Sequence, residues 1–222
     1  MPLALFDLDN TLLHGDSDHL FGEFLSERGL ASGAERAAQN DGFYRDYQAG
    51  TLDIDAYLRF ALAPLAELDT EQLAALQRDF LREKVASIAL PDARALVERH
   101  RAAGDTLVII TATNEFVTAP IAEYFEVPHL IASRCEQRDD GSLTGRPTGI
   151  ACFQNGKVQR IEAFCAESGH SLEGSYFYSD SANDIPLLQR VTHPVAVDPD
   201  PRLNAWALAH RVPRISLRGA SL

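Results

Sequence analysis

Apolar and polar positions follow two different rhythms along the chain, and the change falls near Pro91. The apolar run over 3–8, within "LALFDLDN", is typical of a buried strand. From about 14 to 87, apolar residues recur at the spacing of helices. They form three stripes: Leu20, Phe21, Phe24 and Leu25; Ile54, Tyr57, Leu58 and Ala61; Leu73, Leu76 and Phe80. Asp69 and Gln72 predict a capping box at the start of the third helix.

After Pro91, strand and helix alternate. Apolar, β-branched runs predict strands at "DTLVIITAT", "VPHLIAS", "GSYFYSDS", "HPVAVDPD" and "RVPRIS". Helical patterns cover 92–103, the line Val117–Ile121–Phe125, and "GKVQRIEAFCAESG". Pro120 is expected to bend or break the second of these helices. The turn-rich segment "EQRDDGSLTGRPTG" predicts a hairpin.

This order predicts an α/β fold: a Rossmann-like, doubly wound and mostly parallel sheet with an inserted α-helical cap domain. The catalytic core would comprise 1–13 and 88–222, and the cap 14–87. In such sheets ligands bind beyond the carboxyl ends of the strands. Asp7 with Asp9, Thr111 and Asp180 each fall at such an end, so we expect them to converge.

The composition and net charge of the chain limit the classes of partner that it is expected to bind. The 222 residues are 45% hydrophobic, and 20 basic against 32 acidic residues leave a net charge of −12. This balance argues against non-specific binding to nucleic acid or to acidic membrane surfaces. No stretch approaches the roughly 20 apolar residues of a membrane span, and no export signal is visible. Three cysteines without metal-site spacing favour the cytoplasm, and no oligomeric state is predicted.

The candidate metal ligands are all oxygen donors: Asp7, Asp9, Asp180 and Asp184. Asp7 and Asp9 are expected on one face of the first strand, because alternate residues of a strand point the same way. Like charges a few ångströms apart raise each other's pKa, and a divalent cation removes that cost. Without a histidine or cysteine pair nearby, the donor set favours a hard ion, and we expect Mg²⁺.

Hydrogen-bond donors for a phosphoryl group are expected at the same edge of the sheet. The candidate phosphate-binding residues are Thr111, Ala112, Lys157 and Asn183. A carboxylate can attack phosphorus and form an aspartyl-phosphate. A second carboxylate nearby can protonate the leaving alcohol and later activate water. We therefore predict a phosphatase that acts on a small phosphorylated metabolite, with Asp7 as nucleophile and Asp9 as general acid and base.

Four short motifs, in this order, resemble those of the haloacid dehalogenase superfamily: "DLDNT", "TAT" at a strand end, "GK" opening a helix, and "SDSAND". The resemblance spans about 5 to 190, and the helical insert resembles the phosphoserine-phosphatase-like branch with a helical cap. It implies the same roles for Asp7 and Asp9. It also implies a Mg²⁺ site from Asp7, the main-chain carbonyl of Asp9 and Asp180, supported by Asp184 and Asn183, with phosphate at Thr111 and Lys157.

The cap residues bear on the substrate. In that branch a cap glutamate takes the substrate amine and a cap arginine its carboxylate. Asp16 stands at the glutamate position and Ala61 at the arginine position, while Arg59 would face another way. The cap acids and aromatics suit a cationic or aromatic head group, and the candidate head-group residues are Asp16, Tyr44 and Tyr47. An amino-alcohol phosphate such as histidinol phosphate, the substrate assigned to some proteins resembling this branch, is the favoured class.

Other functions remain open from the sequence. They are a phosphoserine phosphatase, a phosphotransferase that uses the same intermediate, a phosphatase of broad specificity, and a non-catalytic phospho-receiver-like protein. Receivers lack a helical cap, which counts against the last of these. Asp184 and Asn183 have an alternative role as caps of the helix that follows them.

Overall fold

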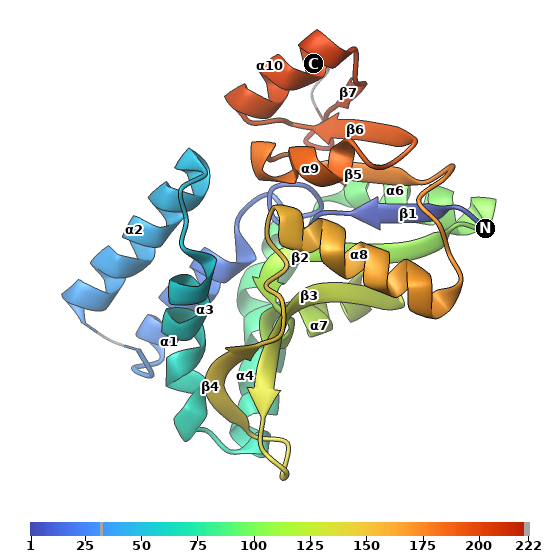
Figure 1. Cartoon of the computed structure of the whole chain (residues 1–222). Coiled ribbons are helices and arrows are strands. Elements are labelled where there is room, and N and C mark those ends of the chain that lie inside the picture. The colour runs from blue at the N-terminus through green and yellow to red at the C-terminus, as the bar shows by residue number, and fades with distance from the viewer. Residues whose placement is uncertain (32, 220–222) are drawn as a thin grey trace.

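The computed structural model describes residues 1–31 and 33–219. In that part of the chain seven strands form one sheet in the order β4-β3-β2-β1-β5-β6-β7 (Figure 1). The strands are β1 Leu3–Phe6, β2 Thr106–Asn114, β3 His129–Gln137, β4 Leu143–Thr148, β5 Tyr176–Ser179, β6 His193–Val197 and β7 Arg214–Ile215. Each pair is parallel except the β3–β4 hairpin, which confirms the predicted sheet and its hairpin excursion.

Helices cover both faces of the sheet, as a doubly wound fold requires. They are α6 Pro91–Ala103, α7 Glu115–Tyr124, α8 Asn155–Ser168, the short pair η3 Ala182–Asp184 and α9 Ile185–Leu188, and α10 Pro201–His210. The central strand β1 shows why, because its alternate residues enter different cores. Ala4 and Phe6 pack with α6 and α7, and Leu3 and Leu5 pack with α8, α9 and α10.

A helical insertion separates β1 from α6. It contains α1 Ser17–Glu27, α2 Ala34–Ala49, α3 Ile54–Leu62, η1 Ala63–Glu67, α4 Thr70–Phe80, η2 Leu81–Val85 and α5 Ala86–Ile88. The capping box predicted at Asp69 and Gln72 is present. The two ends of the insertion meet in a bridge between Leu13 and Ala89. Figure 1 shows α1, α2 and α3 beyond the carboxyl end of β1, where the insertion covers that edge of the sheet.

Pro120 does not break its helix, which was one of the two outcomes expected of it. Helix α7 runs through Pro120 from Glu115 to Tyr124. A proline cannot donate to the carbonyl four residues earlier, which here is that of Phe116. The side chain of Gln77, on α4, supplies the missing donor: its Nε2 lies 2.6 Å from the Phe116 oxygen. A tertiary contact therefore satisfies the group that the proline leaves free.

Helix α2 is attached to the rest of the protein by few contacts. Asn40 is its single buried residue, and it donates to the main-chain oxygen of His19 on α1 at 3.2 Å. The close approach of α1 and α2 requires Gly22, because a Cβ there would lie 2.8 Å from the Asn40 side chain. At the other end, Nη1 of Arg202 on α10 donates to the Ala49 carbonyl at 3.0 Å. Helix α2 thus forms the outer part of the insertion.

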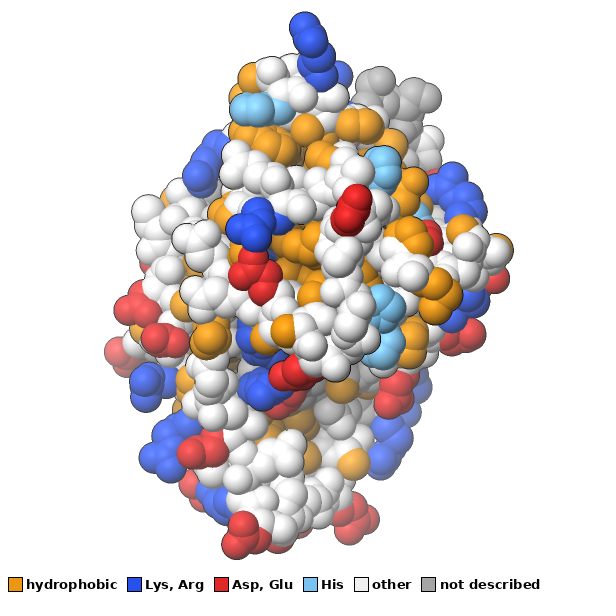
Figure 2. Space-filling view, turned by 45° about the vertical axis from the view of Figure 1, so that its right-hand side comes forward, with side chains coloured by type: hydrophobic (Ala, Val, Ile, Leu, Met, Phe, Trp, Pro, Cys, Tyr) orange, Lys and Arg blue, Asp and Glu red, His pale blue; other side chains and the backbone are white. Residues whose placement is uncertain are grey.

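Charged side chains of both signs are intermixed over the face drawn in Figure 2, with hydrophobic side chains between them. Along the described ranges, no helix combines the length and the hydropathy needed to cross a membrane.

Gly156, in the first turn of α8, meets the backbone so closely that it accepts no side chain. A Cβ there would lie 2.0 Å from the Ala151 carbonyl oxygen. We expect Gly156→Ala to lower the free energy of unfolding by about 1–3 kcal/mol, because backbone must shift to admit the methyl group. Equilibrium unfolding in urea measures this change.

Gly42→Ala is the matched control, since Gly42 lies inside α2 and its nearest neighbour is an Arg45 side chain 3.8 Å away. Alanine is favoured over glycine in a helix, so this variant should gain roughly 0.5–1 kcal/mol. Equal changes of the same sign at both positions would contradict the role of the contact with Ala151.

Candidate active site

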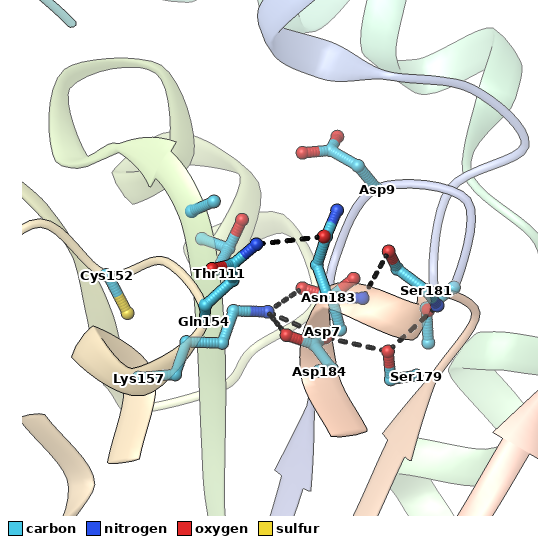
Figure 3. A network of polar contacts seen from close by, with 12 residues as sticks. Asp7, Asp9, Thr111, Cys152, Gln154, Lys157, Ser179, Ser181, Asn183 and Asp184 are labelled. Atoms are coloured by element: carbon cyan, nitrogen blue, oxygen red, sulfur yellow. Dashed lines mark hydrogen bonds and ion pairs between the residues drawn. The ribbon is translucent and has the colours of Figure 1, made fainter. Parts of the chain in front are cut away.

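Three segments that are distant in sequence meet at a buried lysine. Lys157, in the first turn of α8, places its Nζ 2.7 Å from Oδ1 of Asp7 and 2.8 Å from the Asp184 carboxylate (Figure 3). Asp7 follows β1 directly, and Asp184 ends the short helix η3 after β5. The structure therefore brings together the predicted aspartate and lysine motifs at one edge of the sheet.

Burial dominates the electrostatics of this cluster. Lys157 is 2% exposed. Burial opposes its charge, but the carboxylates of Asp184 and Asp7 outweigh that effect and raise the pKa of the lysine. Burial raises the pKa of Asp7 to about 7, although Lys157 lowers it. Asp184 also accepts a hydrogen bond of 2.7 Å from Ser179 Oγ, so this carboxylate is held by two donors.

Asp9 is held apart from Asp7. Its carboxylate accepts from the Ser17 amide at 2.6 Å and from Thr113 Oγ1 at 2.8 Å. In Figure 3 it is directed away from Asp7 and Asp184. Burial, followed by the charge of Asp16, raises the pKa of Asp9 to about 7. A carboxyl group with this pKa can donate or accept a proton near neutral pH.

The backbone between the two aspartates differs from the predicted geometry. The strand was expected to continue through residue 8, which would place Asp7 and Asp9 on one face. The strand β1 ends at Phe6, and the chain turns at Asp9 and Asn10. Asn10 has the positive φ of 57° that such a turn requires. The turn, rather than strand alternation, sets where the Asp9 carboxylate lies.

Asp180 joins the cluster through Thr11. The Thr11 hydroxyl donates to Asp180 Oδ1 at 3.1 Å and accepts from the Asp180 amide at 3.1 Å. Burial, then the negative charges of Asp7 and Asp184, raise the pKa of Asp180 well above its ordinary value. A buried carboxylate that its neighbours destabilise in this way is suited to a cation.

Within 1–31 and 33–219, no three His, Cys, Asp or Glu side chains surround one point in the manner of a complete metal site. All four predicted ligands accept hydrogen bonds, but to different extents. Asp184 accepts from Lys157 and Ser179, and the two Asp9 oxygens accept from Ser17 and Thr113. Asp7 and Asp180 each accept through Oδ1, from Lys157 and Thr11. Asp7 and Asp180 provide two carboxylates, and main-chain oxygens and water commonly complete a Mg²⁺ site. The donors present therefore fit a hard ion through few protein carboxylates.

The predicted phosphate-binding residues lie near the same carboxylates. They differ in the groups to which their side chains are already hydrogen-bonded. Thr111 is buried near the end of β2, and its Oγ1 accepts from the Thr113 amide at 3.2 Å. Thr111 and Ala112 line the cavity that reaches Asp7. Asn183 instead faces α2: its Nδ2 donates to the Tyr47 carbonyl at 3.1 Å, and its Oδ1 accepts from Gln154 at 3.3 Å.

The alternative role of Asn183 and Asp184 as side-chain helix caps is not observed. The hydroxyl of Ser181 caps η3 by accepting from the Asn183 amide. Asp184 precedes α9 without a capping hydrogen bond from its side chain. Both side chains thus point to other partners.

An acidic and aromatic cavity continues from the carboxylate cluster into the insertion. Its volume is about 40 Å³, room for about three waters. The head-group candidates all line it. Asp16 caps α1 by accepting from the His19 amide at 2.8 Å, Tyr44 packs on the His19 ring, and Tyr47 packs toward Phe153.

No lysine or arginine side chain of the described residues lines this cavity. As expected, Arg59 faces elsewhere, and with Arg134 it lines a separate cavity of about 190 Å³. A substrate carboxylate would therefore find no guanidinium in the cavity near Asp16.

Sequence patterns missed the residues that hold the catalytic candidates in place. Ser17 and Thr113 orient Asp9, Thr11 contacts Asp180, and Ser179 contacts Asp184. Their hydroxyl or amide groups lie within or beside the four motifs, which is the signal that could have identified them. Their partners depend on the folded chain.

Comparisons with known proteins agree with this geometry. The family model described as haloacid dehalogenase-like hydrolase matches residues 4–189. A histidinol-phosphatase of Neisseria meningitidis serogroup C is 46% identical over 208 residues, which cover 92% of this chain and 94% of the relative.

Two solved structures share the fold. A protein of unknown function from Bordetella pertussis Tohama I has a TM-score of 0.90 and 43% identity, covering 97% of this chain and 98% of that one. A substrate-bound phosphoserine phosphatase has a TM-score of 0.68 and 20% identity, covering 92% and 89%. Family model, relatives and fold lead to the same conclusion: the chain belongs to the haloacid dehalogenase-like hydrolases and is a phosphomonoesterase of that family.

Proposed function

We propose that the protein is a Mg²⁺-dependent phosphatase that hydrolyses a small amino-alcohol phosphate, with histidinol phosphate as the favoured substrate, through an aspartyl-phosphate on Asp7. The observation that carries this proposal is the pair of separately held carboxylates. Asp7 lies against Lys157, and Asp9, with a pKa of about 7, is held by Ser17 and Thr113.

In the first step, an Asp7 carboxylate oxygen attacks phosphorus in line with the ester bond. The phosphorus–oxygen bond to the alcohol breaks, and Asp9 gives its proton to the departing oxygen. In the second step, Asp9 takes a proton from water, whose oxygen attacks phosphorus. Inorganic phosphate leaves, and the Asp7 carboxylate is restored. Lys157, the Thr111 hydroxyl and the amides near Ala112 would bind the phosphoryl oxygens throughout.

Mg²⁺ would be held by Asp7, Asp180 and the main-chain carbonyl of Asp9. When bound, the ion would supply positive charge to the phosphoryl oxygens and lower repulsion between the carboxylates. We assign Asp184 a different part from the one predicted: its carboxylate positions Lys157, with Ser179 behind it. Asn183 would act between the phosphate site and α2, because it contacts the Tyr47 carbonyl.

The substrate class rests on the cavity and on the relative. Four carboxylates, those of Asp7, Asp9, Asp16 and Asp18, line a cavity with aromatic walls, and its described lining contains no lysine or arginine side chain. A cationic head group would neutralise them, with Asp16, Tyr44 and Tyr47 as contacts. The 46% identical relative is a histidinol-phosphatase. Phosphoserine is the alternative, but its carboxylate would lie among acidic groups.

We further propose that the insertion, residues 14–87, moves as a cap on the core of 1–13 and 88–222. The cavity lies between residues of the insertion, such as Asp16 and Tyr44, and residues of the core, such as Asp7 and Thr111, so movement of the insertion would admit the substrate and release the products. The contacts of Asn183 and Arg202 with the end of α2 would break when it opens.

A cytoplasmic location completes the proposal. The thiols of Cys135 and Cys152 are buried and free of disulfides, as expected of a protein that folds in a reducing compartment.

A panel of phosphate monoesters with Mg²⁺ and a phosphate-release readout tests the proposed activity. We expect kcat/KM for histidinol phosphate to exceed that for phosphoserine by about tenfold or more, because the phosphoserine carboxylate would be desolvated without a cationic partner. Equal or faster turnover of phosphoserine would refute the proposed substrate. A second alcohol that suppresses phosphate release would identify a phosphotransferase.

Asp7→Asn should lower kcat by roughly 10⁴-fold or more, since it removes the nucleophile while the side-chain volume is kept. Asp9→Asn should lower it by about 10²- to 10⁴-fold. Both are measured on histidinol phosphate, with circular dichroism as the control for folding. A wild-type rate in Asp7→Asn would move the attack to another group.

Mg²⁺ should stabilise the protein more at high pH than at low pH. Asp7 and Asp9 have pKa values of about 7 when folded, against an ordinary value of 3.8. Without metal, the folded state keeps protons that the unfolded chain releases, so stability falls as the pH rises from about 4 to about 7. A cation replaces those protons. We expect the Mg²⁺-induced rise in Tm to be larger at about pH 8 than at about pH 5.5.

Asp180→Asn is the control for the metal, and its Tm should respond less to Mg²⁺ at both pH values. Differential scanning calorimetry with EDTA or MgCl₂ gives all the required values. An equal Mg²⁺ shift at both pH values would contradict the link between the ion and the buried carboxylates.

A further inference from the structure

We propose that Asp18 and Tyr57 form a second polar subsite in the cavity, which binds an N–H-bearing group of the substrate distinct from the ammonium at Asp16. The substrate head group would then carry two separate nitrogen centres, such as an amine and an imidazole. This inference rests on the proposed function and adds to it two specificity-determining residues and the number of polar groups they recognise.

Asp18 is fixed in the cavity by the core. It lies in the first turn of α1 and is 8% exposed. Nδ2 of Asn114 donates to its Oδ1 at 3.3 Å. Asn114 is itself immobilised as the N-cap of α7, where it accepts from the Val117 amide at 3.2 Å. The Asp18 carboxylate is therefore held by a residue at the end of β2, next to the phosphate-binding turn.

Tyr57 contributes a phenol to the same cavity. It lies on α3, is buried, and packs edge-to-face on Phe43 of α2 with ring centroids 5.2 Å apart. Burial raises the pKa of the Asp18 carboxyl, and the Tyr57 side chain lowers it by a smaller amount. Leu52, Ile54 and Phe43 add apolar walls to the cavity. A carboxylate and a phenol oriented together among apolar walls form a specific acceptor for N–H groups.

Asp16 and Asp18 cannot serve as one site. Asp16 precedes the helix and uses Oδ1 to accept from the His19 amide, whereas Asp18 lies inside the first turn. Side chains two positions apart on a helix do not face each other. Different groups hold them: Asn114, at the end of β2, donates to Asp18, whereas the His19 amide in the first turn of α1 donates to Asp16.

Two separately held carboxylates define what a ligand must offer. With its phosphoryl group at Asp7, a substrate would meet Asp16 with one nitrogen and the pair of Asp18 and Tyr57 with a second. A head group that ends at the first nitrogen makes no contact with Asp18 and gains no binding energy from it. The geometry therefore favours a head group with two nitrogen centres over a simple amine.

A pair of substrates separates the two subsites. Histidinol phosphate carries an amine and an imidazole, and 2-aminopropyl phosphate carries the amine without the ring. The measured quantity is the ratio of kcat/KM for the first substrate to that for the second. In Asp18→Asn we expect this ratio to fall by about tenfold or more, and in Tyr57→Phe by about three- to tenfold.

Asp16→Asn is the matched control. It should lower kcat/KM for both substrates and leave their ratio within about twofold of the wild type, because both carry the amine. An unchanged ratio in Asp18→Asn and Tyr57→Phe, with wild-type melting curves, would overturn the second subsite while the proposed phosphatase stands. If Asp18→Asn fails to fold, Tyr57→Phe decides, since it removes a single hydroxyl group.

The proposed function fails in a different way. A wild-type protein that releases phosphate from neither substrate in Mg²⁺ would refute that function, and the second subsite with it. A wild-type ratio near one, with good activity on both substrates, would refute the second subsite alone.

Discussion

The contact of Lys157 with Asp7 and Asp184 is the interaction on which the site depends. It joins the end of β1, the start of α8 and the short helix after β5, with 150 positions between Asp7 and Lys157 and 27 between Lys157 and Asp184. A lysine buried to this extent is tolerated because two carboxylates flank it, and each carboxylate is tolerated because of the lysine. Loss of one partner would leave the others charged and without compensation. Gly156 makes the contact possible by allowing the backbone before Lys157 to turn against Ala151.

Several aspartate side chains near this contact are buried, so negative charge gathers in a region shielded from water. Burial raises the pKa of Asp7, Asp9, Asp16, Asp18 and Asp180. This arrangement is costly in the free protein, and a bound cation lowers the cost. Positive charge is expected in two forms, a divalent ion at one end of the cavity and a cationic head group at the other. The same constraint would explain how a chain of net charge −12 can act on an anionic ester: the phosphoryl group would be attracted locally, by Lys157 and the proposed Mg²⁺.

The helical insertion shares residues with the chemistry as well as enclosing it. Ser17, at the start of α1, orients Asp9, and Asp16 and Asp18 on either side of it face the cavity. Asn183 connects the loop that bears Asp180 and Asp184 to the main chain of α2. Movement of α2 would therefore change the proposed phosphate site through the Asn183 side chain. Conversely, order at that site would favour the position of α2 in which this contact is made.

The sequence by itself determined the fold class, the insertion after the first strand and the four segments that meet at the sheet edge, because these follow from periodicity and from motifs that are local. It also predicted Asp7, Asp9, Asp180 and Lys157 as site residues, because each stands at or near the end of a strand or the start of a helix in the sequence pattern. Only the tertiary structure decided which oxygens are free. Hydrogen bonds from Ser17, Thr113 and Ser179 engage Asp9 and Asp184, and the turn at Asn10 separates Asp9 from Asp7. Likewise the Gln77 side chain lets α7 continue through Pro120. Such partners come from distant positions, and the energy of a buried polar group depends on neighbours that local patterns do not specify.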